Sequence, residues 1–335
     1  MSSDRSSPTR QSRTVGALLA LHAGDSLGAS VEFKSHSQIA VLFPDGLRDI
    51  VGGLPQSWPA PPWYAGQATD DTDLTRAVLL AYKSRLAPPD PDFDVAKAAA
   101  DNSLKWLDGE WPGRRRGEKP LDIGNATLKG LNLYRKTQDV AKAGAGQGNA
   151  GNGSLMRCLP TGLFQPDPEL RIQESVAISK ITHDDVRCTV ACAAYNEIVA
   201  ALIRGVAVPE AIAAGEAVAA RLEQGHDGPV YKSLRQGREL RVSDMAKQGP
   251  PPTLPGKCSG YVLDSLTVAA SALLDARSLE DVVVDVVRIG RDTDTNAAIA
   301  GGLLGARDGA EAVPERWKEK LQFGNEFREI AVLLT

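Results

Sequence analysis

The sequence has few cysteines, and their arrangement does not indicate a disulfide framework. Cys158, Cys188, Cys192 and Cys258 form no CxxC pair, whereas small secreted domains that depend on disulfides are much denser in cysteine. We therefore expect reduced thiols. Cys188 and Cys192 are four residues apart and lie near His183, a spacing that zinc could use. The surrounding VRCTVACAAYNEIVAALI is instead typical of a buried helix, so we expect core cysteines.

A basic surface and a long apolar run are also lacking. Lysine and arginine are scattered along a chain of net charge −4, and the one basic run, at residues 114–116, lies between glycines and prolines in the manner of a solvated loop. This pattern argues against nucleic acid as the main ligand. No apolar run approaches the roughly 20 residues that span a bilayer, and the polar N-terminus lacks the apolar core of a signal peptide. We therefore expect an intracellular, cytoplasmic protein that does not act at a membrane.

No segment shows the sustained alternation of polar and apolar residues that is typical of half-buried strands. Even DVVVDVV has helical neighbours, so we expect an all-α fold. Residues 1–13 are polar, rich in serine and arginine, and predicted to form a disordered tail. With no repeat and no strong linker after residue 14, residues 14–335 are predicted to form a single domain.

Helical spacing and breaker residues divide that domain into a series of helices. A helix is also expected directly after Ser154, and residues 170–205 are expected to form two helices that break at residues 182–184. The remaining predicted helices cover residues 15–27, 73–86, 95–109, 121–136, 209–224, 229–247, 260–276 and 279–289, and a last one follows residue 292.

Two acidic clusters precede apolar helical patterns at opposite ends of the chain. One is Thr69-Asp70-Asp71-Thr72-Asp73 and the other is Asp292-Thr293-Asp294-Thr295. Helix capping explains one acid in each cluster, but not several acids with hydroxyls beside them. Carboxylate and hydroxyl oxygens are the hard ligands that Mg²⁺, Mn²⁺ or Ca²⁺ prefers. We therefore interpret the clusters as two halves of one metal site.

Three further acids stand in apolar or helical contexts. Asp25 lies on the predicted helix 15–27, where a buried carboxylate needs a partner. Glu32 follows it by seven residues, and Asp122 lies at the start of the predicted helix 121–136. Taken singly, Asp25 or Glu32 is as compatible with an ordinary surface acid as with a site residue, and Asp122 could simply cap its helix.

A stretch dense in glycine, residues 144–153, runs into GNGS and then LMR. Such a stretch lets backbone amides approach a phosphate or carboxylate, and we expect those of GNGS to lie at a helix N-terminus. Neither a P-loop nor a dinucleotide-binding fingerprint is present. His183 lies at a helix junction, where a capping or packing role is the alternative to function. The loop 41–68, which carries Trp58, Trp63 and Tyr64, is expected to wall the site.

Seven motifs together resemble the ADP-ribosylglycohydrolase family and occur in that family's order over residues 16–309. They are GDSLGASVEF, ATDDTDLT, LDIGNAT, GNGSLMR, THDD, SGYVLDSL and GRDTDTNAAIAGGLLGA. The resemblance is greatest to the arginine-specific branch, which contains dinitrogenase reductase-activating glycohydrolase. It implies a compact, orthogonal all-α bundle with two Mg²⁺ or Mn²⁺ ions in a cleft.

The resemblance also implies roles for individual residues. The implied metal ligands are Thr69, Asp70, Asp71, Asp292, Asp294 and Thr295. The implied catalytic carboxylates are Glu32, Asp71 and Asp122. The implied substrate-binding residues are Gly151, Asn152, Gly153, Ser154 and Met156 around the diphosphate, His183 on the distal ribose or phosphate side, and Tyr261 at the adenine. Arg291 is a departure, because many members have glycine there.

The implied activity is metal-dependent hydrolysis of the N-glycosidic bond between ADP-ribose and an arginine side chain. Two alternatives remain open. The same scaffold could act on ADP-ribosyl-serine or O-acetyl-ADP-ribose, or it could bind ADP-ribose or serve a structural role without activity. The expected partner is an ADP-ribosylated protein or a small molecule that contains ADP-ribose, and the protein is expected to be a monomer. Glycines 301, 302 and 305 should let the last helix pack closely and hold its carboxylates in fixed geometry.

Overall fold

The computed structural model describes residues 7–52, 64–86 and 92–335, and within them it confirms the all-α prediction. These residues form sixteen α-helices and three short 3-10 helices. The only β-type pairings among them are two isolated bridges, Ser35 with Gly290 and Gly151 with Tyr261. Trp58 and Trp63, which were expected to wall the site, lie outside the described residues.

The first half of the described chain contains α1 (Arg10–Gly28), η1 (Ala29–Val31), α2 (His36–Leu42), α3 (Asp70–Ser84), α4 (Val95–Leu107), α5 (Asn125–Thr137), η2 (Val140–Lys142), α6 (Leu159–Phe164) and α7 (Pro168–Lys180). The second half contains α8 (Val186–Ile203), α9 (Val208–Leu222), α10 (Pro229–Glu239), α11 (Val242–Gln248), α12 (Val262–Leu274), α13 (Leu279–Ile289), α14 (Thr293–Asp308), η3 (Ala310–Ala312), α15 (Glu315–Lys318) and α16 (Gly324–Leu334).

Helix α1 begins earlier than expected, so the predicted tail at residues 1–13 ends too late. The side chain of Thr9 caps the helix by accepting a hydrogen bond from the backbone N–H of Ser12 at 3.1 Å. The guanidinium of Arg13 donates to the carbonyl of Ala306, near the C-terminus of α14, at 3.0 Å. Because a cap and this tertiary contact order them, residues 10–13 belong to the fold.

Three other predicted helices have different bounds. Helix α3 begins at Asp70, so the acidic cluster forms its first turn instead of preceding it. The predicted helix 229–247 is interrupted at Leu240 and Arg241, between α10 and α11. No helix begins directly after Ser154, because residues 152–157 form turns and α6 starts only at Leu159.

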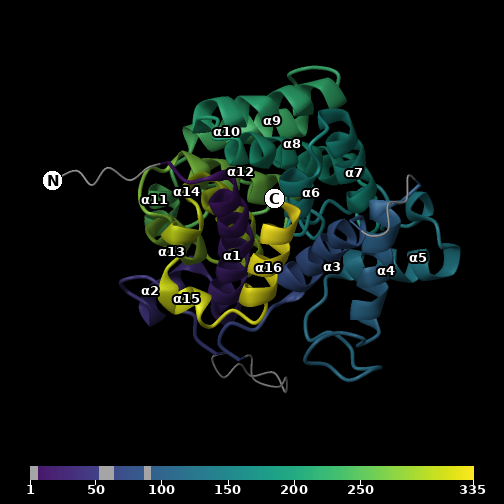
Figure 1. The fold of residues 1–335 in the computed structure, drawn as a ribbon. Helices are drawn as coiled ribbons and strands as arrows, with labels where there is room; N and C mark the ends of the chain where they lie inside the picture. Colours follow the sequence, from purple (N-terminus) through teal and green to yellow (C-terminus); the bar gives the residue numbers. More distant parts are fainter. Residues whose placement is uncertain (1–6, 53–63, 87–91) are drawn as a thin grey trace.

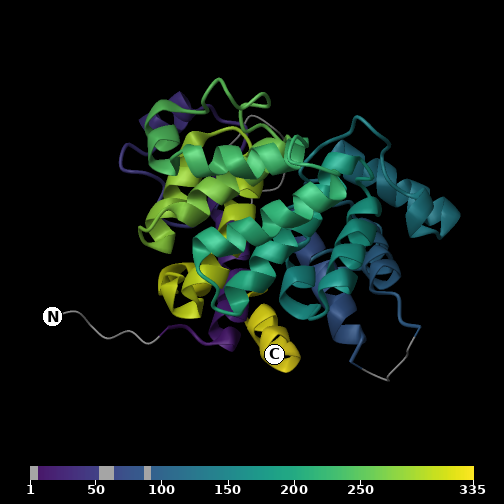
Figure 2. The ribbon, with the colours of Figure 1, turned by 90° about the horizontal axis from the view of Figure 1, so that it is seen from above.

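The centre of the fold is the contact between α1 and α14, which come from opposite ends of the chain. In Figure 1 α1 runs through the middle of the molecule, with α16 beside it. Figures 1 and 2 show α8, α9 and α10 grouped on one side of this centre and α4 and α5 at the edge. Helices α8, α12 and α13 also contact α14, so the last apolar helix of the sequence is surrounded by others.

Glycines bring the backbones of α1 and α14 together. A Cβ atom added at Gly24 would lie 2.2 Å from the carbonyl oxygen of Ala297, and one at Gly301 would lie 2.3 Å from that of Ala20. At Gly305 it would lie 2.1 Å from the carbonyl oxygen of Gly16. Such distances leave no room for a side chain, which confirms that the glycines of α14 allow close packing.

Helix α8 alone among the described residues is long and apolar enough to cross a membrane, but 83% of this stretch is buried inside the protein. That burial is characteristic of a core helix. Cys188 and Cys192 lie on α8, and both are buried and free, as are Cys158 and Cys258. The expectation of core cysteines is thereby confirmed.

Replacement of Gly301 by alanine is expected to lower the free energy of unfolding by about 1–3 kcal/mol, because the added methyl group forces α1 and α14 apart. Urea denaturation measures this change. Gly225→Ala is the matched control, since nothing lies within 4 Å of the position that its Cβ would take. Equal stability of the two variants would contradict the close-packing argument.

Candidate metal centre and its two cavities

The ends of three helices converge at the predicted metal site. Helix α1 ends at Gly28, and α14 begins so close to it that a Cβ atom at Gly28 would lie 2.4 Å from the backbone nitrogen of Asp294. The hydroxyl of Thr293 donates to the carbonyl of Gly28 at 2.8 Å. The hydroxyl of Thr295 donates to the carboxylate of Asp71, in the first turn of α3, at 3.2 Å. The two acidic clusters therefore lie in one place, as predicted.

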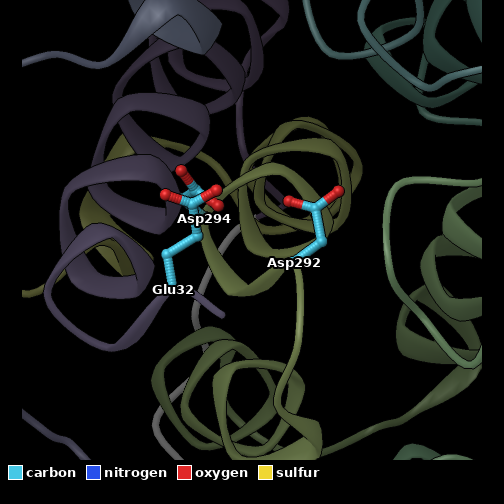
Figure 3. A group of neighbouring side chains, drawn as sticks. All are labelled: Glu32, Asp292 and Asp294. Atoms are coloured by element: carbon cyan, nitrogen blue, oxygen red, sulfur yellow. The ribbon is translucent and has the colours of Figure 1, made fainter. Parts of the chain in front are cut away.

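Carboxylates from these helix ends face one another. Glu32, Asp292 and Asp294, which Figure 3 draws as sticks, lie close together. Each offers an oxygen, and these oxygens all lie within 4.8 Å of one another. The Oδ1 atoms of Asp71 and Asp294 are buried and have no hydrogen-bond partner. Buried carboxylate oxygens without donors call for a cation, and an all-oxygen donor set fits Mg²⁺ or Mn²⁺.

The pKa values of these carboxylates in the protein without ions are raised, which agrees with a cation site. Burial, followed by the charges of Asp122, Asp292 and Asp70, raises the pKa of Glu32 to about 10. Burial, then the charge of Glu32, raises the pKa of Asp294 well above its ordinary value. These carboxylates therefore cannot all be ionised together unless positive charge is added.

Asp25, which the sequence left open, positions the start of α3. Its side chain is fully buried, and its Oδ2 accepts hydrogen bonds from the backbone N–H groups of Thr69 and Thr72, both at 3.2 Å, and from the hydroxyl of Thr72. It thus caps α3 from the neighbouring helix α1. Burial raises its pKa to about 7. The sequence showed only that this acid needed a partner.

The side chain of Asn152 is hydrogen-bonded to the carboxylate of Asp292. Its amide nitrogen donates to Oδ2 of Asp292 at 2.7 Å and to the hydroxyl of Ser265 at 3.0 Å. Its backbone N–H donates to the carbonyl of Gly260 at 3.0 Å. Both amide hydrogens are used within the protein, so the side chain of Asn152 orients Asp292. That Asn152 also binds substrate stays a prediction.

The glycines beside Asn152 allow close approach of the imidazole of His183. A Cβ atom at Gly153 would lie 2.8 Å from Cε1 of His183, and one at Gly151 would lie 3.3 Å from Nε2. The other ring nitrogen is 2.8 Å from the hydroxyl of Thr182. Burial and then the charge of Arg157 lower the pKa of His183 to about 3, so the ring is neutral.

A cavity of about 630 Å³ opens over the carboxylates and the glycine loop. Most of the predicted site residues line it. They are Glu32, Asp70, Asp122, Gly151, Asn152, Gly153, Met156, His183, Asp292, Asp294 and Thr295.

Four predicted site residues do not line this cavity. Thr69 and Asp71 are buried and bonded to the other helix ends, and Thr69 lines a neighbouring cavity. Ser154 is fully buried and accepts a hydrogen bond from Ser179 at 2.9 Å, so the prediction that it lines the diphosphate is wrong. The ring of Tyr261 lies beside Arg187, whose guanidinium carbon is 5.7 Å from the ring centroid. The structure therefore does not bring Tyr261 into the cavity.

A second cavity of about 460 Å³ lies beside the first. Asp70 and Asp122 line both cavities. Tyr64 lines only the second, which agrees with the expectation for the end of the loop 41–68. The cap of α5 is Gly124, which has no capping side chain, so the alternative that Asp122 caps this helix is wrong.

Asp73 has a role that sequence reasoning missed. Its two oxygens accept hydrogen bonds from the indoles of Trp106 and Trp111, both at 2.7 Å. These partners are 33 and 38 residues away in sequence, and no local pattern links them. Asp73 therefore ties α3 to the last turn of α4, through Trp106, and to the segment after α4 that leads to Asp122, through Trp111.

Removal of the Asn152 amide is expected to weaken binding of Mn²⁺ by about 10- to 100-fold, since a partner that orients a metal ligand commonly contributes that much. Titration of Asn152→Ala with Mn²⁺, followed by electron paramagnetic resonance, measures the change. Asn125→Ala is the control, because Asn125 lines the same cavity but is exposed at the start of α5. Equal Mn²⁺ affinities of both variants would refute the positioning role.

The metal-free protein is expected to lose stability as pH rises from about 5 to about 8. The pKa values of Glu32, Asp25 and Asp294 are raised in the folded state. The folded state therefore binds more protons than the unfolded chain over this range, and the free energy of unfolding falls as pH increases. Added Mg²⁺ should raise the melting temperature more at pH 8 than at pH 5.

Thermal melts in EDTA and in Mg²⁺ test this expectation. Asp294→Asn removes one buried carboxylate and should reduce both the pH dependence without metal and the stabilisation by Mg²⁺. Melts that are unaffected by Mg²⁺ and Mn²⁺ at every pH would refute the assignment of a metal centre.

Comparison with known proteins agrees with this geometry. The family model described as ADP-ribosylglycohydrolase matches residues 6–335. The ADP-ribosyl-[dinitrogen reductase] glycohydrolase of Rhodospirillum rubrum is 29% identical over 326 residues, which cover 96% of this chain and 94% of that protein. The ADP-ribosylarginine hydrolase Tri1 of Pseudomonas putida (strain GB-1) is 27% identical over 325 residues, covering 95% of this chain and 76% of that protein.

A solved structure has the same fold. It is described as an ADP-ribosylglycohydrolase-related protein complex, and it matches with a TM-score of 0.73 and 28% identity over 97% of both chains. The family match extends over nearly the whole chain, and the motifs quoted above supply the acidic cluster and the glycine loop. The resemblance that the sequence motifs indicated is thereby confirmed, and the chain belongs to the ADP-ribosylglycohydrolase family.

Proposed function

We propose that this protein releases ADP-ribose from mono-ADP-ribosylated protein by hydrolysing the N-glycosidic bond to an arginine side chain. The observation that carries the proposal is the meeting of two cavities at Asp70 and Asp122. The cavity with the glycine loop would hold ADP-ribose, and the second cavity would hold the arginine. The names of the relatives in Rhodospirillum rubrum and Pseudomonas putida support this choice of substrate.

Two divalent cations, Mg²⁺ or Mn²⁺, would be held by Thr69, Asp70, Asp71, Asp292, Asp294 and Thr295, with Glu32 beside them. When bound, they supply positive charge to the ribose hydroxyls and a water of lowered pKa. The buried oxygens of Asp71 and Asp294 that have no partner support this set. Asn152 holds the carboxylate of Asp292 by a hydrogen bond. Asp25 holds the start of α3, which carries Asp70 and Asp71, by accepting from the backbone of Thr69.

Asp122 would be the residue that reacts. Burial and then the charge of Asp292 raise its pKa in the metal-free protein. At the junction of the two cavities, that carboxyl can give its proton to the departing guanidine nitrogen as the bond to the anomeric carbon breaks. The surrounding carboxylates stabilise the positive charge that develops on the ribose. A water then adds its oxygen to the anomeric carbon and its proton returns to Asp122, which gives ADP-ribose and free arginine.

The second cavity suits a cationic side chain. Glu118 and Asp122 line it together with Asp70, and Tyr64 offers an aromatic face at its wall. A guanidinium forms strong, directional hydrogen bonds to carboxylates and packs well on aromatic rings. Arg114 and Lys320 also line this cavity, so the acids are not the only charges there. These features favour arginine over serine as the group that is released.

Incubation with a mono-ADP-ribosylated arginine protein and Mg²⁺ or Mn²⁺ tests the proposal. We expect release of free ADP-ribose, and a loss of about 10²- to 10⁴-fold in kcat for Asp122→Asn, because the proton donor is removed. Asp227→Asn is the control, since the side chain of Asp227 is fully exposed. No release with either metal would refute hydrolysis of the arginine linkage.

Parallel assays separate the alternatives. If serine-linked protein or O-acetyl-ADP-ribose is hydrolysed and the arginine-linked protein is not, the scaffold acts on another bond. If ADP-ribose binds but no substrate turns over, the protein is a binding module. Glu118→Gln should raise the KM for the arginine-linked protein with little change for O-acetyl-ADP-ribose, because only the first places a guanidinium in the second cavity.

A further inference from the structure

Two residues at the rim of the larger cavity have an unfavourable backbone conformation. Phe33 has φ of 62° and Arg291 has φ of 74°, in the left-handed region that glycine and asparagine favour. Their backbones are joined, since the N–H of Phe33 donates to the carbonyl of Arg291 at 2.7 Å and the N–H of Arg291 donates to the carbonyl of Lys34 at 2.7 Å. Side chains in this region cost free energy, and such strain is often found at binding sites.

The side chain of Arg291 gains no hydrogen bond or ion pair from the described residues that would offset this cost. Its side chain is exposed and lines the cavity. Among the described residues, no ion pair and no side-chain hydrogen bond includes Arg291, although other arginines form many. An arginine that serves only the fold would be expected to use its guanidinium.

Arg291 is also the only cationic side chain that lines this cavity in the described part of the chain. The other charged lining residues are five acids, Glu32, Asp70, Asp122, Asp292 and Asp294. His183 lines it too, but is neutral because its pKa is lowered to about 3. A ligand with negative charge would therefore find one fixed positive side chain of the protein here, at the rim.

Arg291 stands next to the glycine loop through short contacts. It precedes Asp292, whose carboxylate accepts from Asn152 at 2.7 Å. The backbone N–H of Asp292 donates to the carbonyl of Cys258 at 3.1 Å, and Gly260 in the same loop accepts from the backbone of Asn152 at 3.0 Å. Ser259 and Gly260 line the same cavity as Arg291, Gly151 and Gly153. The hydrogen bonds above therefore link the backbone beside Arg291 to the glycine loop.

We propose that Arg291 binds the diphosphate of the ADP-ribose group and thereby sets the affinity of this protein for its substrate. This inference rests on the proposed function, because it takes ADP-ribose as the ligand of the larger cavity. Arginine matches phosphate oxygens with two parallel hydrogen bonds. The contact also offsets the repulsion between the diphosphate and the five lining acids.

Matched substitutions at Arg291 test this role by calorimetric titration with ADP-ribose in Mg²⁺. Arg291→Gln keeps the bulk and the backbone strain but removes the charge, and should weaken binding about tenfold or more. Arg291→Lys keeps the charge but loses the paired donors of the guanidinium. Its affinity for ADP-ribose should lie between those of the wild type and Arg291→Gln. The affinity for adenosine, which has no phosphate, should not change.

Two further measurements separate a ligand contact from damage to the fold. Arg291→Gly relieves the backbone strain, so it should melt at or above the wild-type temperature while binding ADP-ribose as weakly as Arg291→Gln. Higher ionic strength should weaken ADP-ribose binding by the wild type more than by Arg291→Gln. Binding of Mn²⁺, measured without ADP-ribose, should be the same for the wild type and Arg291→Gln.

The outcomes are distinct. If the wild type and Arg291→Gln bind ADP-ribose equally, the role of Arg291 is refuted and the proposed function stands. If the wild type does not bind ADP-ribose at all, the proposed function is refuted and this inference falls with it. If Arg291→Gln loses affinity for Mn²⁺ and adenosine as well as ADP-ribose, Arg291 acts through the metal centre and the proposal is wrong.

Discussion

The structure depends on the close contact between α1 and α14. Glycines on both helices allow their backbones to touch, and this contact sets the end of α1 against the start of α14. Glu32 directly follows η1 at the end of α1, and Asp294 lies in the first turn of α14. Close backbone packing at Gly28 therefore places these two carboxylates near each other. A site that holds cations needs this rigidity, because ligand geometry has to be set before the ion arrives.

Bringing these carboxylates together is unfavourable for the fold by itself. Burial raises the pKa of most of them, and two buried oxygens have no partner. The fold offsets part of this cost with donors: the start of α3 bonds to Asp25, and Asn152 bonds to Asp292. The remaining cost of burying several carboxylates would be relieved by bound cations. The same residues that destabilise the metal-free protein would therefore bind ions tightly.

The two cavities differ in the residues that line them. The larger has carboxylates, a glycine loop and the strained rim of Phe33 and Arg291, whereas the second has Tyr64, Glu118 and the segment that Asp73 anchors through two indoles. Asp70 and Asp122 stand between them. If ADP-ribose occupies the larger cavity, as proposed, the scissile bond would lie at this junction, and the lining of the second cavity would select the leaving group.

The sequence alone determined the helical class, the family and the two acidic clusters, because these are local patterns: helical periodicity, dense oxygen ligands and ordered motifs. Only the tertiary structure decided which residues serve which purpose. Ser154 belongs to a motif yet is buried against Ser179, Asn152 serves Asp292, and Asp73 serves two tryptophans more than thirty residues away. Hydrogen-bond partners and burial depend on which helices meet in space, and local sequence patterns do not predict those contacts.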